Sequence, residues 1–132
     1  MASADYPLAS CPGTPNCVSS DPDDPNPSRS LPPIPFDGAA EAAIDRMSTV
    51  LAEMPGCRIV QREPRRLRCE FRSRIFRFVD DVELVAVPHS PETGSGGGIL
   101  HFRSASRLGR WDVGANRRRM DRIRHLFERR SD

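Results

Sequence analysis

The stretch RSASRLGRWDVGANRRR, from Arg103 to Arg119, combines residue types that bind anions. Between Arg103 and Arg124 the chain has eight arginines against two aspartates, which gives a local net charge of +6. A guanidinium can hold a carboxylate or phosphate through two parallel hydrogen bonds, and the start of a helix attracts negative charge. The pattern therefore predicts an anion site made of Arg103, Ser104, Ser106, Arg107, Asn116, Arg117 and Arg118. The competing interpretation is a solvated helix face with internal salt bridges. It is the favoured one, because a run of charged residues usually forms an exposed face.

Asp80 and Asp81 are a second group that could do chemistry. Neighbouring residues of a strand point to opposite faces of a sheet, so these carboxylates do not form a ready-made acid–base pair. One of them must lie on the apolar side of its strand, where a carboxylate needs a partner. We expect Asp80, Asp81 and Asp112 to be ion-pair partners of Arg103, Arg107 and the arginines of the NRRR run. The alternative is an enzyme that uses Asp80 and Asp81 with Arg103 and Arg107 in hydrolysis.

Cys11 and Cys17 are the third candidate group, in the segment CPGTPNC. Their C-x5-C spacing differs from the C-x2-C spacing of zinc knuckles and thioredoxin-like redox pairs. The prolines and the asparagine favour a rigid, turn-rich loop docked on the domain. Two further interpretations stay open, namely a disulfide, which needs an oxidising compartment, and a reactive redox pair.

The other residues that could bind a metal or catalyse a reaction form weaker sequence patterns. Cys57, Cys69 and the three histidines show no metal-ligand spacing, so we expect no metal and no cofactor. Cys69 lies on the apolar side of a predicted strand and is expected in the core. The segment GSGGG is followed by a strand and not by Lys-Ser/Thr and a helix, so it is no phosphate-binding loop. We expect a flexible hairpin connection there.

Hydrophobic periodicity indicates which elements position these groups. A helix is predicted to begin at Asp37 as N-cap and to end at Pro55-Gly56, with apolar residues at helical spacing. A second helix is predicted to begin near Asp112. Strands are predicted at 58–63, 66–73, 75–87 and 99–107, because apolar and polar residues alternate there. The expected core side chains are Ile44, Met47, Leu51, Met54, Leu67, Cys69, Phe71, Phe76, Phe78, Val82, Leu84, Leu100, Phe102, Met120, Ile123 and Phe127.

The order of these elements predicts an α+β fold with a four-stranded antiparallel sheet and two helices on one face. Residues 1–36 hold nine of the 13 prolines and are expected to form an extended arm that carries the CPGTPNC loop. That arm is either a disordered leader or is laid over the domain and anchored by Ile34 and Phe36. Residues 37–130 are expected to form a single α-β-β-β-β-α domain.

Three blocks of the sequence resemble a known family. They are CPGTPNCVSS, FRSRIFRFVDDVEL and FRSASRLGRWDVGANRRRMDRIR, and they occur in the family's order. On these blocks the chain resembles the family catalogued as domain of unknown function 1499, from about Leu8 to Leu126. The resemblance implies relatives in bacteria and in chloroplast-bearing eukaryotes, often behind a signal or membrane segment. It implies no settled activity, cofactor or substrate.

From these observations we expect a non-enzymatic binding or assembly module that holds an anionic ligand or partner at its arginine-rich strand-to-helix turn. The alternative is an enzyme, either redox through Cys11 and Cys17 or hydrolytic as above. Nucleic acid is not the expected partner, because the net charge is only +2 and aromatic residues are not interleaved with the arginines. No run of apolar residues is long enough to cross a membrane, although peripheral membrane contact stays open. The chain as written is expected in the cytoplasm, or in the cell envelope if its start is truncated.

Overall fold

The computed structural model describes residues 6–12, 16–26, 29–73, 78–107 and 114–130. It contains two helices and an antiparallel sheet, as the sequence predicts. In chain order the elements are β1 (Cys17–Ser19), β2 (Ile34–Phe36), α1 (Ala40–Ala52), β3 (Cys57–Glu63), β4 (Arg66–Arg72), β5 (Val79–Pro88), β6 (Gly98–Ser106) and α2 (Ala115–Arg129).

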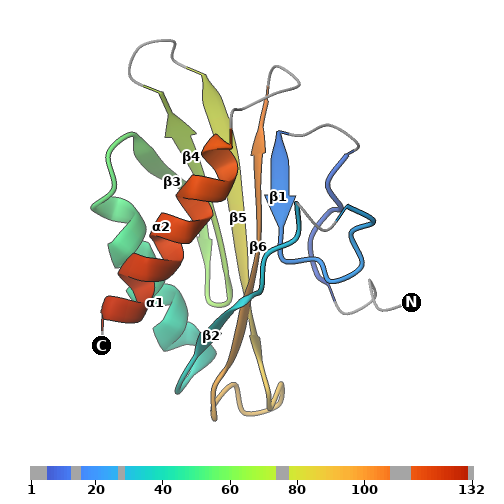
Figure 1. The fold of residues 1–132 in the computed structure, drawn as a ribbon. Coiled ribbons are helices and arrows are strands. Elements are labelled where there is room, and N and C mark those ends of the chain that lie inside the picture. Colours follow the sequence, from blue (N-terminus) through green and yellow to red (C-terminus); the bar gives the residue numbers. More distant parts are fainter. Residues whose placement is uncertain (1–5, 13–15, 27–28, 74–77, 108–113, 131–132) are drawn as a thin grey trace.

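The sheet has six strands, so the prediction of four is wrong. The strands run in the order β1-β6-β5-β4-β3, and β2 also pairs with β6 (Figure 1). β1 and β2 share one edge of β6, where β1 pairs with residues 103–105 and β2 with residues 98–100. Three-residue strands are too short to show an alternating pattern, and Pro35 in β2 argues against a strand from the sequence. Pro35 fits here because β2 is an edge strand, which tolerates a residue without an N–H donor.

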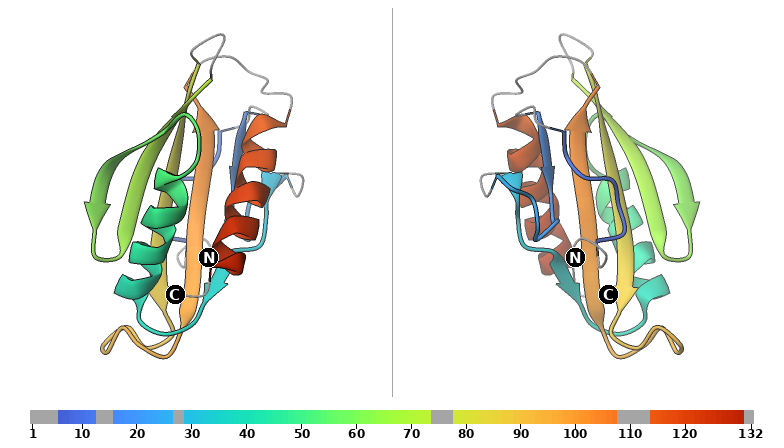
Figure 2. Two further views of the ribbon diagram at one scale, coloured as in Figure 1. Left: turned by 90° about the vertical axis from the view of Figure 1, so that its left-hand side faces the viewer. Right: turned by 90° about the vertical axis from the view of Figure 1, so that its right-hand side faces the viewer.

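Both helices pack on one face of the sheet (Figure 2). α1 lies over β3, β4 and β5, and α2 lies over β6 and β1. The core between the two layers contains the expected apolar residues of both helices and of the strands, all with 7 % exposure or less. They include Ile44, Met47, Leu51, Leu67, Cys69, Phe71, Val82, Leu84, Leu100, Phe102, Met120, Ile123 and Phe127.

Two details of the predicted elements need correction. The N-cap of α1 is Ala39 and not Asp37, because Gly38 with φ of 77° turns the chain between them. Phe78 is 57 % exposed, since it precedes the first residue of β5 and lies outside the alternation of that strand. Phe76, Asp112 and Trp111 lie outside the described residues.

The face of the sheet opposite the helices is strongly charged, and we call it the open face. The register of β3 to β6 places six arginines and four carboxylates on it. These residues are Arg58, Arg66, Arg68, Arg72, Arg103, Arg107, Glu63, Glu70, Asp81 and Glu83.

Candidate functional site

The strand alternation at the end of β6 divides the predicted anion-site residues between the two faces of the sheet. Ser104 lies on the helix-facing side and is fully buried, while Arg103 lies on the open face beside Glu83. Arg107 directly follows β6, and its N–H continues the ladder by donating to the Val79 carbonyl. The structure therefore brings together two groups, one on each face, and does not bring the seven residues into one pocket.

The helix-facing group is a buried hydrogen-bond network centred on Asn116 of α2. The Ser104 hydroxyl donates to Asn116 Oδ1 at 2.5 Å. Asn116 Nδ2 in turn donates to the Asn16 carbonyl oxygen and to Ser106 Oγ, both at 3.0 Å. Arg119 Nη1 donates to the same Oδ1 at 2.9 Å. These polar groups satisfy one another, so the network joins α2 to β6 and to the segment before β1.

Arg119 also forms an ion pair with Asp80, with 2.9 Å between Arg119 Nη2 and Asp80 Oδ2. Both side chains are largely buried, with 17 % and 11 % of their areas exposed. The Arg119 guanidinium lies 4.8 Å from the centre of the Phe71 ring, which adds a cation–π contact. Asp80 thus lies on the apolar side of β5 with a partner, the third arginine of the NRRR run.

The open-face group is an ion-pair network around Arg107. Its Nε and Nη2 donate to the two carboxylate oxygens of Asp81, each at 2.9 Å, and Nη2 also donates to Glu70 at 2.6 Å. Arg68 approaches Asp81 at 3.8 Å. Hydrogen bonds to Asp81 and then Glu70 raise the pKa of Arg107 further above its usual value. The small side chain of Ala105, directly opposite Asp81, leaves room for Arg107 to lie across the strand.

Asp80 and Asp81 are therefore held on opposite faces by different arginines. Asp112, the third expected partner, lies outside the described residues. Within the ranges that the structure describes, no three histidine, cysteine, aspartate or glutamate side chains gather as metal ligands.

Four open-face arginines, Arg58, Arg66, Arg72 and Arg103, make no ion pair in the described part of the chain. Arg103 is partly buried, and its Nε has no hydrogen-bond acceptor there. A buried guanidinium N–H without an acceptor is costly, so this position favours an incoming anion.

The first turn of α2 carries Arg117 and Arg118, both exposed. Gly114 is the N-cap residue, with φ of 77°, and within the described ranges no side chain caps this helix start. Both residues belong to the helix layer, on the other side of the sheet from the open-face group (Figure 2). Among the arginines proposed from the sequence, Arg103 and Arg107 thus share the open face, and Arg117 and Arg118 share the helix start.

Cys11 and Cys17 form a disulfide, with Cα atoms 5.7 Å apart. Cys17 is fully buried in β1, so the bond ties the segment before β1 to the sheet. Of the three interpretations that the sequence leaves open, the structure has the disulfide. A bond anchored in a buried strand is suited to a structural role rather than to turnover.

The N-terminal segment is anchored on β6 by a second set of buried polar contacts. Tyr6 Oη donates to the Phe102 carbonyl at 2.7 Å, and its ring meets His101 edge-on at 5.3 Å. Ser20 Oγ lies 2.8 Å from His101 Nδ1 and accepts the N–H of Phe102 at 2.9 Å. Burial raises the pKa of Tyr6 above its usual value, so this hydroxyl remains a hydrogen-bond donor.

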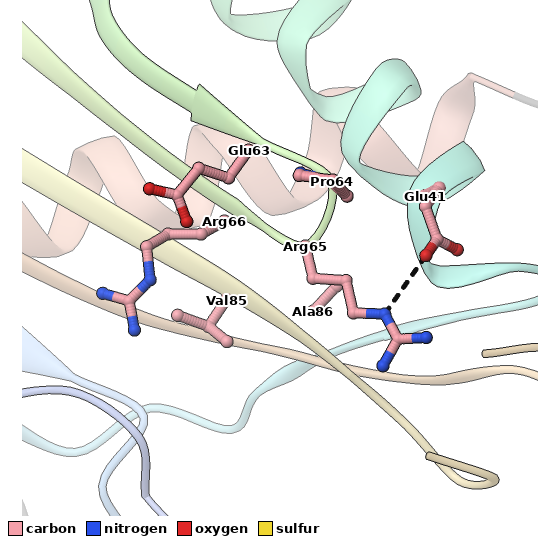
Figure 3. Close-up of a pocket in the computed structure, with 7 residues that line it drawn as sticks. All are labelled: Glu41, Glu63, Pro64, Arg65, Arg66, Val85 and Ala86. Carbon is pink, nitrogen blue, oxygen red and sulfur yellow. Dashed lines mark hydrogen bonds and ion pairs between the residues drawn. The ribbon is translucent and has the colours of Figure 1, made fainter. Parts of the chain in front are cut away.

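A shallow groove of about 520 Å³ lies at the other end of the sheet, between the start of α1 and the β3–β4 turn (Figure 3). Glu41 of α1 and Arg65 of the turn form an ion pair across it at 3.2 Å. A hydrogen bond from its own backbone N–H and one from Arg65 lower the pKa of Glu41. No local sequence pattern indicates this groove, because its walls come from elements far apart in the chain.

The fold and these contacts define an α+β protein with two helices on one side of an antiparallel sheet and a charged open face on the other. The chain belongs to the family described as "Protein of unknown function (DUF1499)", whose model matches residues 7–127, and this confirms the family resemblance seen in the sequence. Comparisons with curated proteins and with solved structures give no match. No helix among the described residues is long and apolar enough to cross a membrane.

Proposed function

We propose that the protein is a non-enzymatic binding or assembly module, and that it holds an anionic partner at one end of the open face. This arginine end consists of Arg58, Arg68, Arg72, Arg103 and Arg107, with three carboxylates among them. The observation that carries the proposal is that the arginines there outnumber the carboxylates by five to three, and that the ion pairs among the described residues involve only two of the five arginines.

The ion pairs decide which charges are available. Arg107 and Arg68 neutralise Asp81 and Glu70. Arg58, Arg72 and Arg103 have no such pairs within the described residues. Exposed ion pairs contribute little to stability, so an arginine excess here is better explained by recognition of an anion than by folding.

The shape of the arginine end supports an extended partner. Its arginines project from one face of the sheet, from β3, from β4 and from the end of β6, so they are spaced by the distance between strands rather than converging on a point. Such a surface fits a carboxylate-rich or phosphate-rich chain better than a single small metabolite. The Asn116 network behind it fixes the end of β6 on which Arg103 and Arg107 stand.

Hydrolysis by Asp80 and Asp81 has less support. The two carboxylates face opposite sides of the sheet, and each is held in an ion pair. An acid–base pair would need both groups within reach of one substrate atom. This arrangement favours the binding module over the hydrolytic alternative.

The proposal is tested by fluorescence anisotropy of full-length protein with two labelled probes, a polyglutamate peptide and inorganic polyphosphate. We expect binding that weakens with added salt, because exposed charges are screened. The double variant Arg72→Gln/Arg103→Gln should bind at least about tenfold more weakly, since a hydrogen bond to a charged group contributes roughly 1.5–3 kcal/mol.

A matched control separates the arginine end from net charge. Arg122 and Arg129 are exposed on α2, so Arg122→Gln/Arg129→Gln removes the same charge from the opposite side of the molecule. This control should bind both probes nearly as well as the wild type. If neither probe binds the wild type, or if both double variants lose affinity equally, the proposed surface is wrong.

A further inference from the structure

Cys57 and Cys69 lie side by side on the helix-facing side of β3 and β4. Cys57 is directly opposite Phe71, and Ile59 is directly opposite Cys69, so the two cysteines are diagonal neighbours across the strand pair. Diagonal neighbours on one face remain within reach of each other's side chains. Both are free thiols, and they lie close enough for each to shift the pKa of the other.

The two thiols differ in access to solvent. Cys69 is fully buried in the core, whereas Cys57, the first residue of β3, is only partly buried. A disulfide in solution can therefore reach Cys57 but not Cys69. This asymmetry assigns the attacking role to Cys57 and leaves Cys69 as its only thiol neighbour on the strand pair.

The surroundings stabilise a thiolate at Cys57. The hydrogen bond from Cys69 is the main cause that lowers the pKa of Cys57, and the nearby positive charge of Arg119 lowers it as well. The same hydrogen bond, together with burial, raises the pKa of Cys69. Arg119 is held in place by Asp80 and by Asn116, at 2.9 Å each. A thiolate with a cation nearby is the reactive form of cysteine.

We propose that Cys57 and Cys69 form a redox-active dithiol that takes disulfides as its substrates. Cys57 Sγ attacks one sulfur of a disulfide R–S–S–R, which forms a Cys57–S–S–R mixed disulfide and releases RS⁻. Cys69 then gives its proton to solvent or to the leaving thiolate and attacks Cys57 Sγ, which releases the second RS⁻. In total the two cysteines are oxidised to one disulfide, and R–S–S–R is reduced to two RSH.

Closing this bond requires a small shift of the start of β3. Diagonal neighbours are farther apart than disulfide-linked residues usually are, so Cys57 must approach β4. Cys57 follows the turn at Gly56, and the register of β3 shifts between Ile59 and Gln61. A strand end beside a bulge is where such a shift disturbs the fewest ladder hydrogen bonds.

The test exposes the folded, full-length protein to excess oxidised glutathione, stops the reaction by acid and alkylation, and maps the products by mass spectrometry. We expect the wild type to lose two hydrogens and to yield a Cys57–Cys69 linked peptide without a lasting glutathione adduct. The Cys11–Cys17 linkage should remain as it is. A stable adduct on Cys57 of the wild type, or no reaction until the protein is denatured, would overturn the proposal.

Two single variants assign the roles. Cys69→Ser should stop at the mixed disulfide, with one glutathione on Cys57, because the resolving thiol is missing. Cys57→Ser should take up no glutathione while folded, since Cys69 is buried. Both variants are checked for cooperative urea unfolding first. Because the wild-type products alone decide the proposal, a variant that fails to fold leaves the test intact.

Discussion

At the scale of single residues, the Asn116 side chain takes part in four hydrogen bonds close to the arginine end. Its amide oxygen accepts from Ser104 and Arg119, and its amide nitrogen donates to Ser106 and to the Asn16 carbonyl. The side chain is fully buried, so bulk solvent does not reach these hydrogen bonds. One residue thus joins α2, β6 and the segment before β1.

Asn116→Ala is therefore expected to destabilise the protein by about 2–4 kcal/mol. It leaves the buried Ser104 hydroxyl without its acceptor, which costs roughly 1–3 kcal/mol, and it removes the hydrogen bonds of Asn116 with Ser106 and Arg119, which contribute roughly 0.5–1.5 kcal/mol each. Urea denaturation gives the free energy of unfolding. The control is Arg122→Ala on the exposed side of the same helix, which should change it by less than about 0.5 kcal/mol. Equal stability of the two variants would show that the network contributes nothing.

The residue scale also shows how far a sequence can predict this site. Alternation along a strand is a local property, so the placement of Asp80 and Asp81 on opposite faces follows from their adjacency. The same rule separates Arg103 and Arg107 from Ser104 and Ser106, although the sequence grouped them as one site. Which arginine meets each carboxylate depends on the register of β5 with β4 and β6, and no local pattern encodes that register.

At the scale of elements, β1 and β2 complete the sheet, although they belong to the proline-rich segment that the sequence predicts to be an extended arm. Val18, Leu31, Ile34 and Phe36 from this segment are part of the core. Arg124 of α2 donates to the carbonyl oxygens of Pro32 and Pro33, which fixes the approach to β2. The longer strands and both helices could be predicted because each repeats its own period several times. β1 and β2 could not be predicted, because each is only three residues long and forms by pairing with the free edge of β6 rather than through a pattern of its own.

The disulfide before β1 is expected to stabilise this edge through the unfolded chain. Its cysteines are six residues apart, and the chain-entropy model gives about 2 kcal/mol for so short a loop. Reduction with excess dithiothreitol should lower the free energy of unfolding by that amount and leave the far-ultraviolet circular dichroism of the native state unchanged. The variant Cys11→Ser should not respond to reductant. Full unfolding on reduction would mean that the bond is a requirement of the fold and not an addition to it.

At the scale of the whole molecule, the family match and the core both include the segment before α1. The family model covers residues 7–127, which includes both short strands. The buried contacts of Tyr6 with β6 lie at the same boundary. The molecule is thus organised around β6, which pairs with β5 along one edge and with β1 and β2 along the other.

The last prediction concerns the fragment 37–130, which the sequence pattern alone presents as a domain. Four side chains of the hydrophobic core, those of Val18, Leu31, Ile34 and Phe36, are missing from it. At roughly 1.5–3 kcal/mol for each buried apolar side chain, their loss removes about 6–12 kcal/mol. This is comparable to the whole stability of a domain, roughly 5–15 kcal/mol. We therefore expect the fragment to show no cooperative thermal transition. The control fragment 6–130 retains every described residue and should unfold cooperatively near the melting temperature of the full chain. If 37–130 also unfolds cooperatively at that temperature, β1 and β2 are additions to an independent domain, and the core formed by the later elements is sufficient for folding.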